Sequence, residues 1–207
     1  MTVTPEGEAR PKRKRMPRAE REHQMIETAE AVFAELGYAT ASMDEIAERV
    51  GVSKPMLYEY FHSKEGLLLA CIRHSRAELR SVTEHAVTGA GDAEEAIRRG
   101  LHAYFVFIRE HRQAWSLLRQ EMTLLGTSAA DEIEATRQQQ TDLIAALMSG
   151  YFASSPRLQV EASAEFVVGA CERMAIWCER HEEVTPELAT DYAMDMVWNG
   201  LRHRAGA

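Results

Sequence analysis

The residues best suited to binding phosphate lie in one short segment. Lys54 and Lys64 each stand at the expected start of a helix. A lysine ammonium group and the free backbone amides at a helix start both suit phosphate oxygens. Ser42, Ser53 and Tyr58 add hydroxyl groups to the same segment. The segment therefore predicts contacts to a phosphate backbone from its two lysines.

The same segment also offers side chains for reading bases. Leu57 and Phe61 are four residues apart and should both face a core. Pro55, Met56 and Tyr60 lie on other faces and could reach base edges in a groove. The methionine could touch a thymine methyl group, or it could only fill space.

Two short helices joined by a glycine turn would hold these residues. Ser42 followed by Glu45 is a capping box for the first helix. Gly51 ends that helix, because glycine accepts the left-handed conformation. Ser53 is an N-cap for the second helix, and Pro55 falls in its first turn. This is the geometry of a helix-turn-helix, whose second helix lies in a major groove. The alternative is a purely structural pair of helices.

Apolar residues recur at three- and four-residue spacing along nearly the whole chain, which predicts an all-α fold. Serine or threonine before proline, at Ser155 and Thr185, predicts an N-cap. The helices are expected at 17–36, between Ser42 and Gly51, between Ser53 and Ser63, and at 64–87, 92–110, 111–125, 128–153, 156–181 and 185–204.

The segment closely resembles the TetR family of transcriptional regulators, in Ser42–Ala47 and Gly51–Glu65. Phe33–Tyr38 is similar to the end of that family's first helix, and the likeness extends over residues 18–80. The resemblance implies a three-helix DNA-binding head with a helix-turn-helix at 18–80. It also implies a helical-bundle body at 81–207 for ligand binding and dimerisation.

The resemblance further places Tyr58 against the DNA backbone. It implies a cytoplasmic homodimer that binds double-stranded DNA at an inverted-repeat operator and is released by a small effector. Repression is favoured over activation. A helical adaptor that binds another protein is the alternative from a different class, but it does not explain why the matching residues concentrate around the turn.

Charge is distributed unevenly along the 207 residues, whose net charge is -8. Residues 10–62 carry nine bases and nine acids, and six of those bases fall between Arg10 and Arg18 with no acid among them. A basic arm at 1–17 on an acidic body is what a phosphate-binding tail would look like. A solvated tail or a purification remnant is the alternative.

The second half is rich in aromatic and sulfur-containing side chains. Most of them should be ordinary core, but such mixtures also line adaptable apolar pockets. Residues 104–109 and 196–201 look similar to regulators that sense long-chain acyl-CoA. The expected effector is therefore a long-chain acyl-CoA or another lipophilic compound. The candidate pocket residues are Tyr104, Phe107, Trp115, Leu118, Met122, Met174 and Trp177.

The last two helices are apolar on more than one face, so one face should meet a second copy of the chain. The candidate interface residues are Cys171, Cys178, Met196, Val197, Trp198 and Leu201. Cys171 and Cys178 are seven residues apart on one helix, too far for a disulfide, and with Cys71 they are expected to be reduced thiols.

Other classes of protein find little support. The histidines form no zinc-enzyme spacing, and no serine stands in a nucleophile elbow, so neither an enzyme nor a cofactor or metal site is expected. Gly89 and Gly91 flank an alanine after a helix, without the strand that a dinucleotide-binding loop requires. No apolar run is long enough for a membrane span, and no signal peptide is expected.

Overall fold

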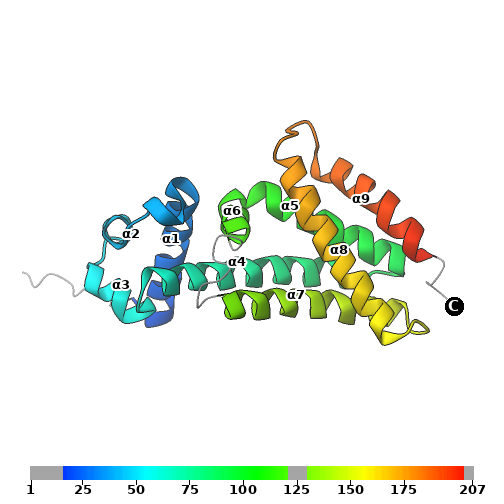
Figure 1. Cartoon of the computed structure of the whole chain (residues 1–207), viewed down its shortest axis with the longest axis horizontal. Coiled ribbons are helices and arrows are strands. Elements are labelled where there is room, and N and C mark those ends of the chain that lie inside the picture. The colour runs from blue at the N-terminus through cyan, green and yellow to red at the C-terminus, as the bar shows by residue number, and fades with distance from the viewer. Residues whose placement is uncertain (1–15, 121–129, 203–207) are drawn as a thin grey trace, which may run out of the picture.

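The computed structural model describes residues 16–120 and 130–202, and within them every regular element is a helix. Figure 1 shows α1–α3 gathered at one end of the molecule, with α4 running from them along the rest and α7 beside it. The expected all-α architecture is confirmed. The helices are α1 (Arg18–Thr40), α2 (Met43–Val50), α3 (Lys54–Phe61), α4 (Lys64–Val87), α5 (Ala93–Glu110), α6 (Arg112–Gln120), α7 (Ala130–Tyr151), α8 (Arg157–Cys178) and α9 (Pro186–Leu201).

The first helix continues four residues beyond its expected end at residue 36. Gly37 has φ 74° and ψ 157°, so it interrupts the helical backbone inside α1. A further turn follows and ends at Thr40, where the amide of Ala41 donates to the Gly37 carbonyl. Glycine therefore bends the chain as expected, but it does not end the helix.

Local signals set the two helices of the turn as expected, with one difference. The Ser42 hydroxyl accepts from the Glu45 amide at 3.1 Å, and Gly51 is left-handed with φ 78°. The Glu45 carboxylate instead accepts from Arg49 at 2.7 Å, so only half of the capping box forms. Ser53 occupies the N-cap of α3 but makes no capping bond with its side chain.

The junction between α3 and α4 is tight. His62 caps α3 with φ 66°, and the Ser63 hydroxyl accepts from the Gly66 amide at 2.8 Å. A Cβ atom on Gly66 would lie 2.2 Å from the backbone oxygen of Phe61. Only glycine fits there, so this residue fixes how α3 is set against the long helix.

Of three later helices, two are capped by the side chain of the residue at which the helix was expected to begin. Asp92 caps α5 by accepting from the Glu95 amide at 2.8 Å, and Thr185 caps α9 by accepting from the Leu188 amide at 3.3 Å. The expectation for Ser155 is wrong, because Pro156 itself occupies the N-cap of α8. The helix expected at 111–125 is described only to Gln120.

The head (α1–α3 and the first turns of α4) shares its core with the body (the rest of α4 to α9). Phe33, Ile46 and Leu57 are fully buried in the head cluster. The same cluster continues into Phe107 of α5 and Trp115 of α6. The helix α6 packs against both α1 and α4. The two halves are therefore joined by apolar packing as well as by α4, which crosses the expected domain boundary at residue 80 without a break.

Candidate nucleic-acid interface and ligand cavity

One face of α3 is open to solvent. Leu57 and Phe61 are buried, as the spacing predicts. Lys54 and Pro55 are exposed, and Tyr58 is 41% exposed. A short helix with a buried apolar face and an exposed polar face can enter a major groove. The N-cap residues Ser42 of α2 and Ser53 of α3 are exposed as well.

Lys54 has an intramolecular partner that sequence reasoning did not identify. Its ammonium group donates to the Asp44 carboxylate of α2 at 2.8 Å, and this bond raises the pKa of Lys54. Both side chains are exposed. A phosphate must compete with Asp44 for the lysine, which lowers the net gain from that contact.

Lys64 is held inside the head. Its ammonium group donates to the backbone oxygens of Ala41 at 2.8 Å and Ala39 at 3.4 Å, and lies 4.5 Å from the centre of the Tyr38 ring. These contacts close the bend between α1 and α2. In this arrangement the lysine stabilises the head, and a phosphate contact would require it to give up backbone acceptors.

Two residues expected to read bases are only half-exposed. Met56 and Tyr60 both pack against the head cluster. The guanidinium of Arg18 lies over the Tyr60 ring, 4.9 Å from its centre. Pro55 and Tyr58 are thus the more accessible side chains of α3.

Arg49 ties the first two helices together, a role that the sequence did not reveal. It donates to Glu35 of α1 at 2.5 Å and to Glu45 of α2 at 2.7 Å. The position of Glu45 four residues before Arg49 signals the second bond, but no local pattern signals the pairing with Glu35.

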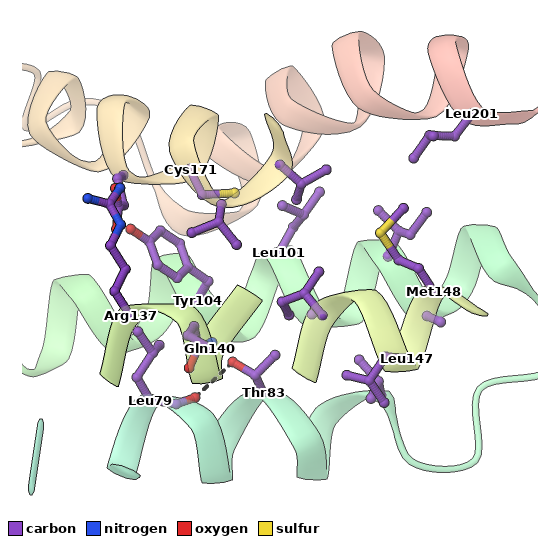
Figure 2. A pocket seen from close by; sticks show the side chains of 18 of the residues that line it. Leu79, Thr83, Leu101, Tyr104, Arg137, Gln140, Leu147, Met148, Cys171 and Leu201 are labelled. Atoms are coloured by element: carbon purple, nitrogen blue, oxygen red, sulfur yellow. Dashed lines mark hydrogen bonds and ion pairs between the residues drawn. The ribbon is translucent and has the colours of Figure 1, made fainter. Parts of the chain in front are cut away.

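A cavity of about 180 Å³ lies inside the body. About 10–15 Å³ suffices for one water molecule, so this cavity has room for a larger guest. Apolar side chains from α4, α5, α7, α8 and α9 form most of its wall (Figure 2). Of the candidate pocket residues, Tyr104 and Trp115 line it.

The other candidate pocket residues lie elsewhere. Phe107 is buried in the head cluster and stacks on His111, with ring centres 4.6 Å apart. Met174 packs against the separate cluster between α5 and α9, and Trp177 is exposed on α8. Leu118 falls in α6, but its side chain is outside the described residues, as is Met122 entirely.

The candidate interface residues also separate. Cys171 and Leu201 line the cavity from inside, and Val197 is buried within one chain. Burial within the single chain leaves these three no surface to offer a partner. Cys178 and Trp198 are half-buried, and Met196 is 66% exposed. Large exposed apolar residues outside the candidate interface set include Leu158 and Phe166 of α8 and Tyr192 of α9.

The cavity has one polar end. Arg76 of α4, and Arg137 and Gln140 of α7, line it there near Tyr104, and Arg137 forms an ion pair with Glu172 of α8. In Figure 2, Tyr104, Arg137 and Gln140 lie at one end, whereas Leu147, Met148 and Leu201 lie at the other. Burial raises the pKa of Tyr104 well above its usual value, so its hydroxyl stays protonated.

A second pocket of about 400 Å³ adjoins α5, α6 and the turn between α8 and α9. Arg109, Arg112 and Glu182 give it a more polar lining than the cavity has. Trp115 lines both spaces and also belongs to the head cluster. This one indole therefore contacts the two cavities and the core that carries α3.

Within residues 16–120 and 130–202, no group of three or more histidine, cysteine or acidic side chains is arranged to hold a metal ion. In the same part of the chain, no helix is both long and apolar enough to cross a membrane.

An exposed helix-turn-helix, joined through one apolar core to a helical body with a cavity, defines a ligand-responsive DNA-binding regulator. Family comparison agrees with the geometry. The model of the bacterial regulatory proteins of the tetR family matches residues 25–71, and the tetracyclin repressor-like C-terminal domain matches residues 93–200. The chain belongs to the TetR family of transcriptional regulators, as its sequence predicts.

Individual relatives extend this result over the whole chain. The HTH-type transcriptional activator FasR of Mycolicibacterium smegmatis is 30% identical over 98% of this chain and 94% of its own length. A TetR-like regulator from Rhodococcus sp. RHA1 is 32% identical, with a TM-score of 0.71 over 91% of this chain and 99% of that one. FadR of Bacillus subtilis, solved with stearoyl-CoA, shares the fold at 16% identity, with a TM-score of 0.74 over 86% of this chain and 98% of its own.

Proposed function

We propose that this regulator works in the cytoplasm as a homodimer that binds an inverted-repeat operator through α3. A largely apolar ligand in the body cavity releases it from DNA. The position of Trp115, in the cavity wall and in the head cluster at once, carries this proposal. A guest that displaces this indole must also disturb the packing of α6 against α1.

The DNA contacts are proposed for the exposed residues Ser42, Ser53, Lys54, Pro55 and Tyr58, with Met56, Tyr60 and Lys64 supporting them from partly buried positions. Lys54→Met should weaken operator binding and reduce the slope of log affinity against log salt by about 1.8, about 0.9 for the one phosphate that each of the two copies contacts. The matched control is Arg80→Met, which removes an exposed cation of α4 that pairs with Glu84. An unchanged slope in Lys54→Met would remove this residue from the interface.

The basic arm lies outside the described residues and remains a prediction. Deleting residues 1–16 should flatten the salt dependence further while largely preserving operator choice, because phosphate contacts carry little sequence information. Gel shifts with operator and scrambled duplexes measure both quantities. A helical adaptor without a DNA role would fail to shift either duplex.

We place the dimer interface on an apolar stripe that differs from the set expected from sequence. Phe166 and Trp177 are eleven residues apart on α8, which puts them on one face. Trp177 contacts Tyr192 of α9, with ring centres 6.4 Å apart, and Met196 follows one turn later. Large apolar side chains exposed next to one another are typical of an interaction site.

Phe166→Glu should therefore yield monomers that fold but lose operator binding, because one α3 reads only one half-site. Sedimentation velocity measures the oligomeric state. Leu158→Glu, an exposed residue at the start of the same helix, tests how far the stripe extends. A dimer unaffected by Phe166→Glu would move the interface to another surface.

Long-chain acyl-CoA is the proposed effector class. FadR of Bacillus subtilis binds stearoyl-CoA in its crystal structure, and the apolar wall of the cavity here suits an alkyl chain. Ligand releases DNA only through differential affinity for two arrangements of the heads. To shift the ratio of the two arrangements from 1:99 to 99:1, the ligand must bind one of them about 10⁴-fold more tightly than the other. Bound operator must then weaken ligand binding by the same factor. Stearoyl-CoA titrated with and without operator tests this reciprocity.

The sign of regulation follows from where the operator lies. The sequence favours repression, whereas the FasR relative is named an activator, which supports activation as the alternative. Ligand-driven release would raise transcription in the first case and lower it in the second. A promoter-reporter assay with and without the regulator distinguishes them.

A further inference from the structure

Two buried donor groups in the cavity wall have no hydrogen-bond partner within residues 16–120 and 130–202. Among the residues that the structure describes, neither the Tyr104 hydroxyl nor the Trp115 indole nitrogen finds a hydrogen-bond partner, although both atoms are shielded from solvent. We propose that these two groups bind an acceptor oxygen at one end of an apolar chain, so that the ligand is an acyl compound held in one orientation. The inference rests on the proposed function and specifies the ligand of the same cavity.

Unpaired buried donors are rare, because folding removes their hydration without replacing it. Here the two side chains are neighbours, because the rings of Tyr104 and Trp115 meet edge-on with centres 6.5 Å apart. Both donor atoms are shielded, so an acceptor oxygen reaches them only as the guest shifts the wall around them. Trp115 is only 5% exposed. They come from different helices, α5 and α6, so one local irregularity of the backbone does not account for both.

The chemistry of the pair defines its complement. An indole N–H only donates, and the raised pKa of Tyr104 keeps its hydroxyl protonated. Two donors favour an oxygen with two lone pairs, such as the carbonyl of an acid, ester or thioester. An alkane of the same length would leave both donors unpaired.

The rest of the wall orients the chain. Tyr104 lies at the polar end of the cavity with Arg137 and Gln140, and Leu147, Met148 and Leu201 close the opposite end (Figure 2). A carbonyl bound at Tyr104 therefore directs its alkyl chain along the cavity toward the C-terminal end of α9. The polar group then lies against Trp115, the residue that reaches the head cluster.

The test compares two probes of similar length, methyl dodecanoate and pentadecane, delivered from cyclodextrin to the full chain and measured by calorimetry. Only the ester carries a carbonyl. The quantity of interest is the ratio of the two Kd values in each variant, since hydration of the free probes cancels between variants. We expect Tyr104→Phe to reduce the preference for the ester roughly three- to tenfold, the range for one hydrogen bond.

Tyr151→Phe is the matched control. Tyr151 also lines the cavity, but its hydroxyl donates to the backbone oxygen of Ala90 at 3.4 Å. Its removal should leave the ratio unchanged. Trp115→Phe is the second test variant and should reduce the ratio as Tyr104→Phe does. An unchanged ratio in both test variants would overturn the inference.

Thermal unfolding without ligand gives an independent readout. Tyr104→Phe removes a donor that costs stability when unpaired, so its Tm should rise, whereas Tyr151→Phe loses a bond and its Tm should fall. A lower Tm in both variants would mean that the Tyr104 hydroxyl has a hydrogen-bond partner in the ligand-free protein, which would contradict the inference.

Two further probes identify the source of the carbonyl. Dodecanoic acid and dodecanoyl-CoA both carry it, and the one whose affinity drops in Tyr104→Phe is bound through this site; a drop in neither overturns the inference. If no apolar probe, stearoyl-CoA included, binds the wild type, then the proposed ligand response fails as well. If probes bind and release DNA without the Tyr104 effect, only the inference fails.

Discussion

Within the part of the chain that the structure describes, the buried acid Glu30 of the head is bonded inside the fold, whereas two donors at the polar end of the cavity are not. Glu30 of α1 accepts from Ser75 at 3.1 Å and lies 3.1 Å from the ring nitrogen of His74, both on α4. Tyr104 and Trp115 have no such partners among the described residues. Glu30 therefore finds its partners within the single chain, whereas the acceptor proposed for Tyr104 and Trp115 comes from outside it.

The head cluster is filled, whereas the body contains a cavity. Leucine-to-alanine substitutions in the two regions should give the largest change in unfolding free energy. Leu57 is fully buried in the head cluster, whereas Leu101 lines the cavity. Leu57→Ala should cost about 2–5 kcal/mol of unfolding free energy, and Leu101→Ala should fall at the lower end of that range because it already lacks contacts on one side. Denaturant titration of both variants measures this. Equal costs would contradict the contrast in packing.

Glycine-to-alanine substitutions should destabilise the protein in the head and stabilise it in the body. Gly66→Ala places a Cβ 2.2 Å from the Phe61 backbone oxygen, so α3 must shift, at a cost of about 1–3 kcal/mol and with loss of operator affinity. Gly169→Ala, within α8, meets no atom of its own chain within 4 Å and should stabilise that chain by about 0.5–1 kcal/mol. Thermal unfolding and gel shifts measure both changes. Retained DNA binding in Gly66→Ala would show that the junction tolerates movement.

The sequence predicted local features of the structure better than contacts between distant residues. Caps and turns are local, so Ser42 and Gly51 could be assigned from the sequence. The partners of Lys54 and Lys64 are not local, because Asp44 and the Ala41 carbonyl reach them only after the helices pack.

The residues that line the cavity were harder to predict from the sequence. Aromatic composition identified Tyr104 and Trp115, but it equally suggested Phe107 and Trp177, which face the head cluster and the outside. A helix has several faces, and periodicity does not tell which of them meets a core, a void or a second chain.

The smallest expected effect concerns Glu30, the buried acid between the head and α4. Burial is the main cause that raises the pKa of Glu30 above its usual 4.5, with Glu78 adding to it; His74 and Ser75 oppose the shift. A carboxyl with a raised folded-state pKa binds its proton more tightly when folded. Its contribution to stability is therefore complete below about pH 4.5 and is lost as pH rises through the folded pKa.

Glu30→Gln keeps an acceptor oxygen for Ser75 but carries no charge. The stability of this variant relative to the wild type should therefore increase with pH from about 4.5 upward, until Glu30 is fully ionised in the folded wild type. Urea titrations from pH 4.5 to 8 measure that difference. Glu27→Gln, an exposed acid on the same helix paired with His23, controls for the substitution itself. A difference that decreases with pH would mean that His74 stabilises the carboxylate more than burial opposes it, and the head would then hold a favourable buried ion pair.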